Sequence, residues 1–137
     1  MALTIIDLND LREHEKVKPD YLEKLKNQIQ RDGILKRPII VDENSKIILD
    51  GHFRFNALKQ LGYSKIPAYF LDYRSPDIVV RTWRNNDIIT KEDVIKAGLT
   101  GKKFPPKSSK HMFDLSNHQI HISKIVKKIN MPLERLK

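Results

Sequence analysis

The chain has 137 residues, 39% of them hydrophobic and 31% charged, a length that favours a single domain over residues 1–137 with one compact core. The absence of cysteine excludes disulfides and thiol chemistry, and no apolar run approaches the roughly 20 residues of a transmembrane helix. The net charge of +9 is concentrated in residues 74–137, which carry 14 basic and 6 acidic side chains, against 12 and 11 in residues 1–73.

The first residues contain neither a basic segment nor the sustained apolar segment of a secretory signal, so we expect a soluble, cytoplasmic protein with no membrane partner. A basic half is typical either of a solvated surface or of a surface that binds anions. Composition alone leaves both interpretations open.

A first strand is predicted at residues 3–8, and a polar stretch containing Glu13, His14 and Glu15 follows it. Two carboxylates beside an imidazole can provide a general base or metal ligands. Surface loops often have the same composition, so this stretch is also compatible with a structural role only.

The segment after residue 18 predicts a helix. Pro19 suits the first helical position, and the apolar residues Leu22, Leu25 and Ile29 recur at helical spacing. Gly33 is typical of a left-handed helix stop. We therefore expect a helix over residues 19–32.

Two short apolar runs, at residues 39–41 and 47–49, predict a buried β-hairpin around the polar turn 42–46. The following turn leads directly into a helix expected over residues 53–61, because Phe53, Ala57 and Leu58 share one face and Gly62 ends the run.

The turn itself, from Asp50 to Arg54, is a candidate phosphate site. A helix N-terminus offers unpaired N–H groups, and Gly51 lets the backbone approach closely. His52 and Arg54 add donors, while Asp50 can hold a magnesium ion that bridges phosphates. The alternative is an ordinary turn in which Asp50 caps the helix and the arginine is solvated.

Two further strands are predicted at residues 66–71 and 78–83. Trp83, the only tryptophan, ends the second of these strands. It is either a packing residue at the strand end or one wall of a ligand pocket. Thr90 and Asp93 resemble a capping box for a short helix over residues 91–97, closed by Gly98.

Residues 101–111 have no periodicity and predict a loop. Its end provides two ammonium groups, two hydroxyls and an imidazole, from Lys107, Ser108, Ser109, Lys110 and His111. Such a loop can hold a carboxylate or phosphate, or it can be a flexible basic loop. A possible strand follows at residues 119–122, and we interpret His118 and His121 as structural or surface residues. The last residues carry no clear pattern.

The elements together predict an α+β fold, a small mixed sheet of about four to five strands with helices packed against it. In chain order, the segments resemble the ParB/sulfiredoxin-like superfamily, and within it the free L-serine kinases of archaea. The resemblance covers most of residues 12–83 and the 104–111 loop. It is carried by His14-Glu15, Gly33-Ile34, Pro38, Ile48 to Arg54, Ala57-Leu58, Leu61-Gly62, Pro67 to Tyr73, Thr82-Trp83 and Phe104 to His111.

The resemblance implies the fold of that superfamily and a role for each matching residue. Glu15 takes the position of the catalytic carboxylate that activates the substrate hydroxyl, and we expect it to be partly shielded from water. Residues 1–73 would form the nucleotide-binding and catalytic part. Catalysis is assigned to Glu15, Asp50 and His52, nucleotide binding to Ile34, Asp50, Gly51, His52, Phe53 and Arg54, and Mg²⁺ to Asp50 through the phosphates.

Residues 74–137 would form the basic, substrate-binding part. The amino acid is assigned to Trp83, Lys107, Ser108, Ser109, Lys110 and His111. This chain departs from the pattern in that Phe53 stands where many relatives have a second histidine and Lys110 where arginine is expected. Only about 20 residues separate Trp83 from the last loop, where relatives have an insertion.

The implied activity is transfer of a phosphoryl group from ADP, or from ATP, to L-serine. Such a transfer needs positioned phosphates, a metal, neutralising donors and a group that orients the hydroxyl, and each has a candidate here. The main alternative is a ParB-type module that binds a nucleotide or DNA without kinase activity, although no helix-turn-helix is recognisable after residue 90. A nuclease of the superfamily is a third option, and the missing cysteine excludes sulfiredoxin activity.

Overall fold

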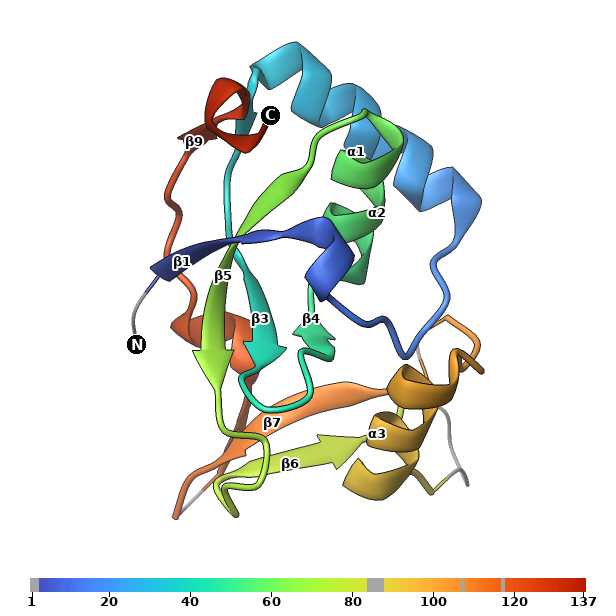
Figure 1. The fold of residues 1–137 in the computed structure, drawn as a ribbon. Helices are drawn as coiled ribbons and strands as arrows, with labels where there is room; N and C mark the ends of the chain where they lie inside the picture. Colours follow the sequence, from blue (N-terminus) through green and yellow to red (C-terminus); the bar gives the residue numbers. More distant parts are fainter. Residues whose placement is uncertain (1–2, 84–87, 107, 117) are drawn as a thin grey trace.

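The computed structural model describes residues 3–83, 88–106, 108–116 and 118–137. A four-stranded mixed sheet lies at its centre, in the order β1 (Leu3–Asp7), β5 (Lys65–Leu71), β3 (Ile39–Asp42) and β4 (Ile48–Asp50) (Figure 1). β3 and β5 are parallel, and the other two pairs are antiparallel. The predicted hairpin, β3 with β4, is confirmed.

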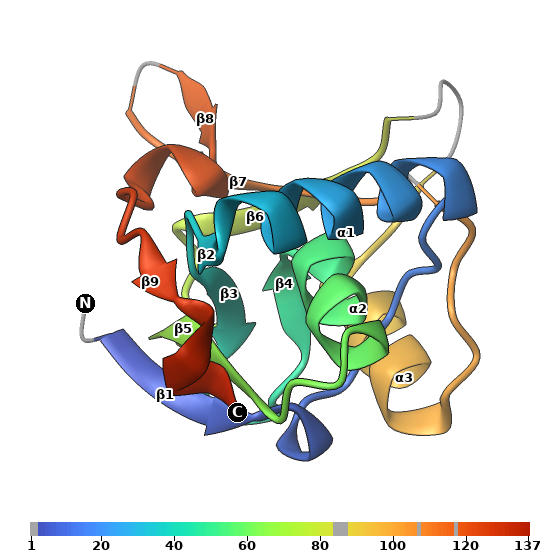
Figure 2. The ribbon, with the colours of Figure 1, turned by 90° about the horizontal axis from the view of Figure 1, so that it is seen from above.

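Two helices, α1 (Pro19–Asp32) and α2 (His52–Gln60), lie side by side against this sheet (Figures 1 and 2). α1 has the predicted bounds: Pro19 stands at its start, and Gly33 ends it with a φ of 68°, in the left-handed region. α2 begins one residue earlier than predicted, because Gly51 and not His52 is its N-cap.

Alternate residues of the central strands pack into two different hydrophobic cores. Ile39, Val41 and Ile48 pack towards α1 and α2, whereas Ile40 and Leu49 pack towards the second half of the chain. Both faces of the sheet are therefore covered. This explains why the two strands appear in the sequence as unbroken apolar runs and not as alternating ones.

The second half forms a separate antiparallel sheet of β6 (Ile78–Arg81), β7 (Lys110–Asp114) and β8 (Gln119–His121), flanked by α3 (Lys91–Thr100). The prediction of one sheet with four to five strands is wrong in this respect. Lys110 and His111, expected in a loop, begin β7, because they pair with Arg81 and Val80 of β6.

α3 starts with the predicted capping box between Thr90 and Asp93 but continues past Gly98 and ends at Gly101, which has a φ of 77°. The expected stop at Gly98 is wrong. This glycine lies inside the helix because a Cβ there would be 2.6 Å from Cδ1 and Cγ1 of Ile47. It marks a close approach between α3 and the segment before β4.

The C-terminal residues, for which no structure was predicted, return to the first half of the chain. β9 (Met131–Pro132) pairs with β2 (Ile34–Leu35), and Figure 2 shows the two strands beside each other. The described residues also contain three short 3₁₀ helices, η1 (Leu8–Asp10), η2 (Ile122–Ile125) and η3 (Leu133–Leu136). Across the described ranges, no helix has the length and apolar character that crossing a bilayer requires.

Candidate functional site

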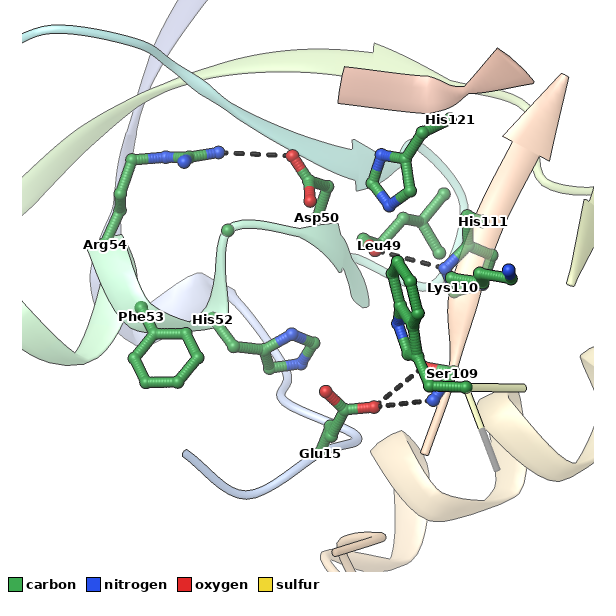
Figure 3. A pocket seen from close by; sticks show the side chains of 12 residues that line it. Glu15, Leu49, Asp50, His52, Phe53, Arg54, Ser109, Lys110, His111 and His121 are labelled. Carbon is green, nitrogen blue, oxygen red and sulfur yellow. Dashed lines mark hydrogen bonds and ion pairs between the residues drawn. The ribbon is translucent and has the colours of Figure 1, made fainter. Parts of the chain in front are cut away.

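Five segments that are far apart in the sequence meet at one cavity of about 280 Å³. They are the stretch before α1, the turn between β4 and α2, the residues after β6, the start of β7 and the end of β8. Figure 3 shows the Glu15–Ser109 pair on one side and the Asp50–Arg54 ion pair on the other. The cavity is lined by Glu15, Leu49, Asp50, Gly51, His52, Phe53, Arg54, Trp83, Ser109, Lys110, His111 and His121.

The turn before α2 has the geometry expected of an anion site. Gly51 adopts a φ of 109°, and no side chain caps the helix, so the first N–H groups of α2 lack a side-chain acceptor. A Cβ at Gly51 would lie 2.3 Å from Cγ2 of Ile39, so only glycine fits between the cavity and the sheet. Gly51 and His52 both line the cavity, which puts this helix start at its wall.

The side chains of Asp50 and Arg54 form an ion pair in which Arg54 Nη2 lies 3.2 Å from Asp50 Oδ2. Arg54 Nη2 also donates to the carbonyl of Pro38 at 3.3 Å, while its Nε is buried with no hydrogen-bond partner in the structure. Asp50 therefore orients the arginine and does not cap α2. Arg54 lines the cavity, and a planar guanidinium group suits phosphate oxygens.

Glu15 is half-buried, as expected for a carboxylate that acts as a general base. Its Oε1 accepts hydrogen bonds from the backbone N–H groups of Ser108 and Ser109, at 3.1 and 2.9 Å, and from Ser109 Oγ at 2.9 Å. Its backbone pairs with Phe104 through a single β-bridge. These contacts hold the carboxylate at the cavity.

Trp83 does not fill the core. It lies two residues beyond the end of β6 with 55% of its surface exposed, and it forms one wall of the cavity. Lys110 Nζ lies 4.5 Å from the centre of its ring, a cation–π distance, and the ring of His121 is 6.4 Å away. This wall combines an aromatic face with a positive charge.

Three buried histidines, His14, His52 and His111, lie close together, and the last two line the cavity. The ring of His14 is 4.6 Å from that of His52 and 5.8 Å from that of His111. Burial lowers the pKa of His14 to about 4 and that of His111 to about 3, and it also lowers the pKa of His52 well below its ordinary value. All three rings are therefore neutral near pH 7.

The hydrogen bonds of His111 and His52 fix the tautomers of these two rings. His111 Nδ1 donates to the carbonyl of Leu49 at 3.1 Å, so in the neutral ring Nε2 accepts from the Tyr73 hydroxyl at 2.8 Å. His52 Nε2 accepts from the backbone N–H of His14 at 3.3 Å.

No group of three or more potential metal-ligating side chains occurs in the parts of the chain that the structure describes. The metal alternative for Glu13, His14 and Glu15 therefore has no support.

Some predicted site residues lie elsewhere. Ile34 lines a neighbouring cavity of about 180 Å³, which shares Phe53 and Arg54 with the main one. The Ser108 side chain is buried and donates to the carbonyl of Pro105, so only its backbone reaches Glu15. Lys107 lies outside the described residues.

Sequence reasoning missed two residues of the cavity wall, Leu49 and His121. His121 was interpreted as a structural or surface residue because no carboxylate or cysteine stands near it in the sequence. Its position depends on the pairing of β8 with β7, in which His121 lies opposite Met112. No local signal in the sequence gives that register.

Residues 1–86 match the ParB N-terminal domain family. An ATP-dependent L-serine kinase of Staphylothermus marinus is 29% identical over an alignment of 156 positions, gaps included, and this alignment covers 93% of this chain and 62% of that protein. A ParB-like protein of Sulfolobus acidocaldarius is 42% identical over 86 residues, covering 63% of this chain and 42% of that protein. The chain thus spans less than two thirds of the length of these curated relatives.

Among solved structures, a free serine kinase in complex with AMP has a TM-score of 0.82 at 18% identity, with 98% of this chain and 93% of that chain covered. SbnI from Staphylococcus aureus with a C-terminal truncation has a TM-score of 0.72 at 14% identity, with coverages of 98% and 89%. These similarities confirm the predicted α+β, ParB/sulfiredoxin-like fold over nearly the whole chain.

Proposed function

Given that this chain belongs to the ParB N-terminal domain family, we propose that it is a free L-serine kinase that transfers a phosphoryl group from an adenine nucleotide to the hydroxyl of L-serine. The product is O-phospho-L-serine. The observation that carries the proposal is the single cavity that joins Glu15 to the anion site at the start of α2 and to the aromatic, cationic wall. Relatives named as ATP-dependent and as ADP-dependent L-serine kinases match this chain at 29% and 33% identity, so both donors stay in the proposal.

In this mechanism the phosphates of the nucleotide bind to the N–H groups at the start of α2 and to the guanidinium of Arg54. The nucleoside extends towards Phe53 and Ile34, which line the neighbouring cavity. Because Arg54 borders both cavities, it links the two ends of the nucleotide.

Asp50 fits a role as the protein ligand of Mg²⁺. Nucleotide sites hold this ion through one or two carboxylates together with the phosphates, and Asp50 is a carboxylate of the cavity wall beside the anion site. When bound, the ion neutralises charge that develops on the phosphate oxygens.

The acceptor serine lies between Glu15 and the wall formed by Trp83 and Lys110. The carboxylate of the amino acid pairs with the Lys110 ammonium group, which stacks on the Trp83 ring. Its hydroxyl then approaches Glu15 Oε1, which accepts the proton as Oγ attacks the terminal phosphorus. The buried, neutral His52 and His111 add no positive charge that would compete with Lys110 and Arg54 for anions.

The test is a product assay. Purified protein with Mg²⁺, L-serine and either ADP or ATP is expected to form O-phospho-L-serine, quantified by mass spectrometry, with one of the two donors giving the faster rate. Formation of no product with either donor would refute the proposal.

Nucleotide affinity tests the phosphate assignment separately. Arg54→Ala is expected to raise the nucleotide Kd measured by isothermal titration calorimetry. Arg74→Ala is the matched control, because it removes the same charge from an exposed arginine that pairs with Asp72 outside the cavity. Equal Kd values for the two variants would remove Arg54 from the site.

The second candidate function, a DNA-binding module, rests on the +9 charge and on the ParB-like relative. In the described residues after 83, α3 is the only α-helix, so the two-helix reading element that such a module needs is not found there. DNA affinity that falls steeply with salt and shows no sequence preference would reflect the net charge alone.

A further inference from the structure

The hydroxyl of Ser109 occupies the place at Glu15 that the proposed function gives to the substrate. Ser109 Oγ donates to Glu15 Oε1 at 2.9 Å, within the reach of a general base for the proton it removes. The backbone N–H of Ser109 holds the same oxygen at 2.9 Å, so Glu15 and this hydroxyl are fixed relative to each other.

A second side chain orients Ser109. His14 Nε2 lies 2.9 Å from Ser109 Oγ. Because the hydroxyl proton is donated to Glu15, the neutral His14 ring donates to Oγ through Nε2–H. A hydroxyl between a base and an orienting group has the arrangement of an activated nucleophile.

Ser109 also faces the cavity that contains the anion site. It lines the same space of about 280 Å³ as Asp50, Gly51 and Arg54. Figure 3 shows Ser109 and Glu15 across this space from the Asp50–Arg54 ion pair. A terminal phosphate held at the start of α2 would thus share the cavity with a protein hydroxyl that already touches the base.

We propose that Ser109 is a phosphoryl acceptor, so that the protein phosphorylates its own Ser109 when no free hydroxyl substrate occupies the cavity. This inference rests on the proposed function, because it uses the same donor and the same base. Ser109 Oγ forms a bond to the terminal phosphorus, and the bond from that phosphorus to the bridging oxygen breaks. The hydroxyl proton passes to Glu15, and the nucleotide leaves with one phosphate fewer.

The experiment measures phosphate incorporation into the full-length protein. Protein, Mg²⁺ and ATP or ADP labelled in the terminal phosphate are incubated without serine, and the protein is then digested with a protease that cleaves after acidic residues. The peptide 94–114 contains three hydroxyl residues, Thr100, Ser108 and Ser109. Tandem mass spectrometry of this peptide is expected to locate the phosphate on Ser109, and this mapping needs no variant.

Ser109→Ala is expected to abolish the label. Ser123→Ala is the matched control: Ser123 Oγ is also bonded to a histidine, at 2.8 Å from His121 Nδ1, but Ser123 does not line the cavity. This control is expected to keep the full label. Glu15→Gln should lower the labelling rate by about 10²–10⁴-fold, the usual contribution of a general base.

The product assay on the same preparation separates the two proposals. Absence of label in protein that makes O-phospho-L-serine overturns the role of Ser109 and leaves the kinase proposal standing. Label on Ser109 without O-phospho-L-serine supports the role of Ser109 and shows that free serine is not the acceptor. Label on another residue, or neither label nor product, overturns this inference.

Discussion

At the scale of single residues, the site depends on donors that are distant in the sequence. The backbone N–H groups that donate to Glu15 Oε1 belong to Ser108 and Ser109, which lie 93 and 94 positions further along the chain. The resemblance predicted that Glu15 belongs to the site, but the hydrogen bonds could not be predicted, since they depend on how β7 returns to the sheet. The turn at Gly51 was predictable because its constraints are local.

Gly51→Ala is expected to lower the free energy of unfolding by more than about 2 kcal/mol, because left-handed strain adds to a clash with Ile39. Gly62→Ala is the matched control: Gly62 has a similar φ of 87°, but a Cβ there would meet nothing within 4 Å. Gly62→Ala should lower the free energy of unfolding only by the left-handed backbone strain, about 1 kcal/mol. Urea unfolding of both variants measures the difference, and equal losses would contradict the close approach to Ile39.

The buried histidines make stability depend on pH. Burial lowers the pKa of His14 to about 4 and of His111 to about 3, whereas the ordinary value is 6.5. Below pH 6.5 the unfolded chain therefore binds more protons than the folded protein, so stability falls as pH falls. We expect a loss of about 1.4 kcal/mol per histidine for each pH unit between roughly 6 and 4.

Urea unfolding at several values between about pH 7.5 and about pH 5 measures this loss. Asp42 does not contribute to the pH dependence of stability in this range. Desolvation raises its pKa, but its hydrogen bonds with Ser45 and Tyr73 outweigh this and lower the pKa below 3.8. Its contribution to stability is therefore lost only in stronger acid. His118→Gln, at an exposed histidine, should leave the pH dependence unchanged. Stability that stays constant down to about pH 5 would show that the rings are not neutral and buried.

At the scale of elements, local patterns predicted most helices and strands but not all of their ends. α1 and the β3–β4 hairpin were predicted because their caps and apolar runs lie within a few residues. The end of α3 was not, because Gly98 suggests a stop locally, while its reason for being glycine is Ile47, about 50 positions away. Glycine is required at position 98 by tertiary packing against Ile47 and not by helix capping.

The close approach of Gly98 to Ile47 predicts an unusual effect of Gly98→Ala. Within a free helix, replacing glycine by alanine stabilises by about 1 kcal/mol. Here the new Cβ would lie 2.6 Å from Cδ1 and Cγ1 of Ile47, a fully buried side chain. We therefore expect a net loss of about 1–3 kcal/mol in the free energy of unfolding.

A double-mutant cycle checks the cause. Adding Gly98→Ala to Ile47→Ala should raise stability, because the helix gains propensity and the clash is gone. If Gly98→Ala raised stability in the wild-type background, the contact between α3 and Ile47 would be absent.

At the scale of the whole molecule, the fold class was predictable and the sheet arrangement was not. The separate sheet of β6, β7 and β8 and the pairing of β9 with β2 depend on contacts between distant segments. Those contacts carry β7 beside the N-terminal stretch, which brings Glu15, Ser109 and Arg54 to one cavity. The basic second half supplies Lys110 to that cavity. Under the proposed function, this ammonium group binds the carboxylate of serine.

Phosphoryl transfer at this cavity is tested most directly by Glu15→Gln, which keeps the size of the side chain and removes its charge. We expect a fall of about 10²–10⁴-fold in the rate of O-phospho-L-serine formation, because the general base is lost. We also expect an unchanged nucleotide Kd, because the phosphates bind at the start of α2. A Glu15→Gln variant that forms O-phospho-L-serine at the wild-type rate would contradict the role of Glu15 as the general base.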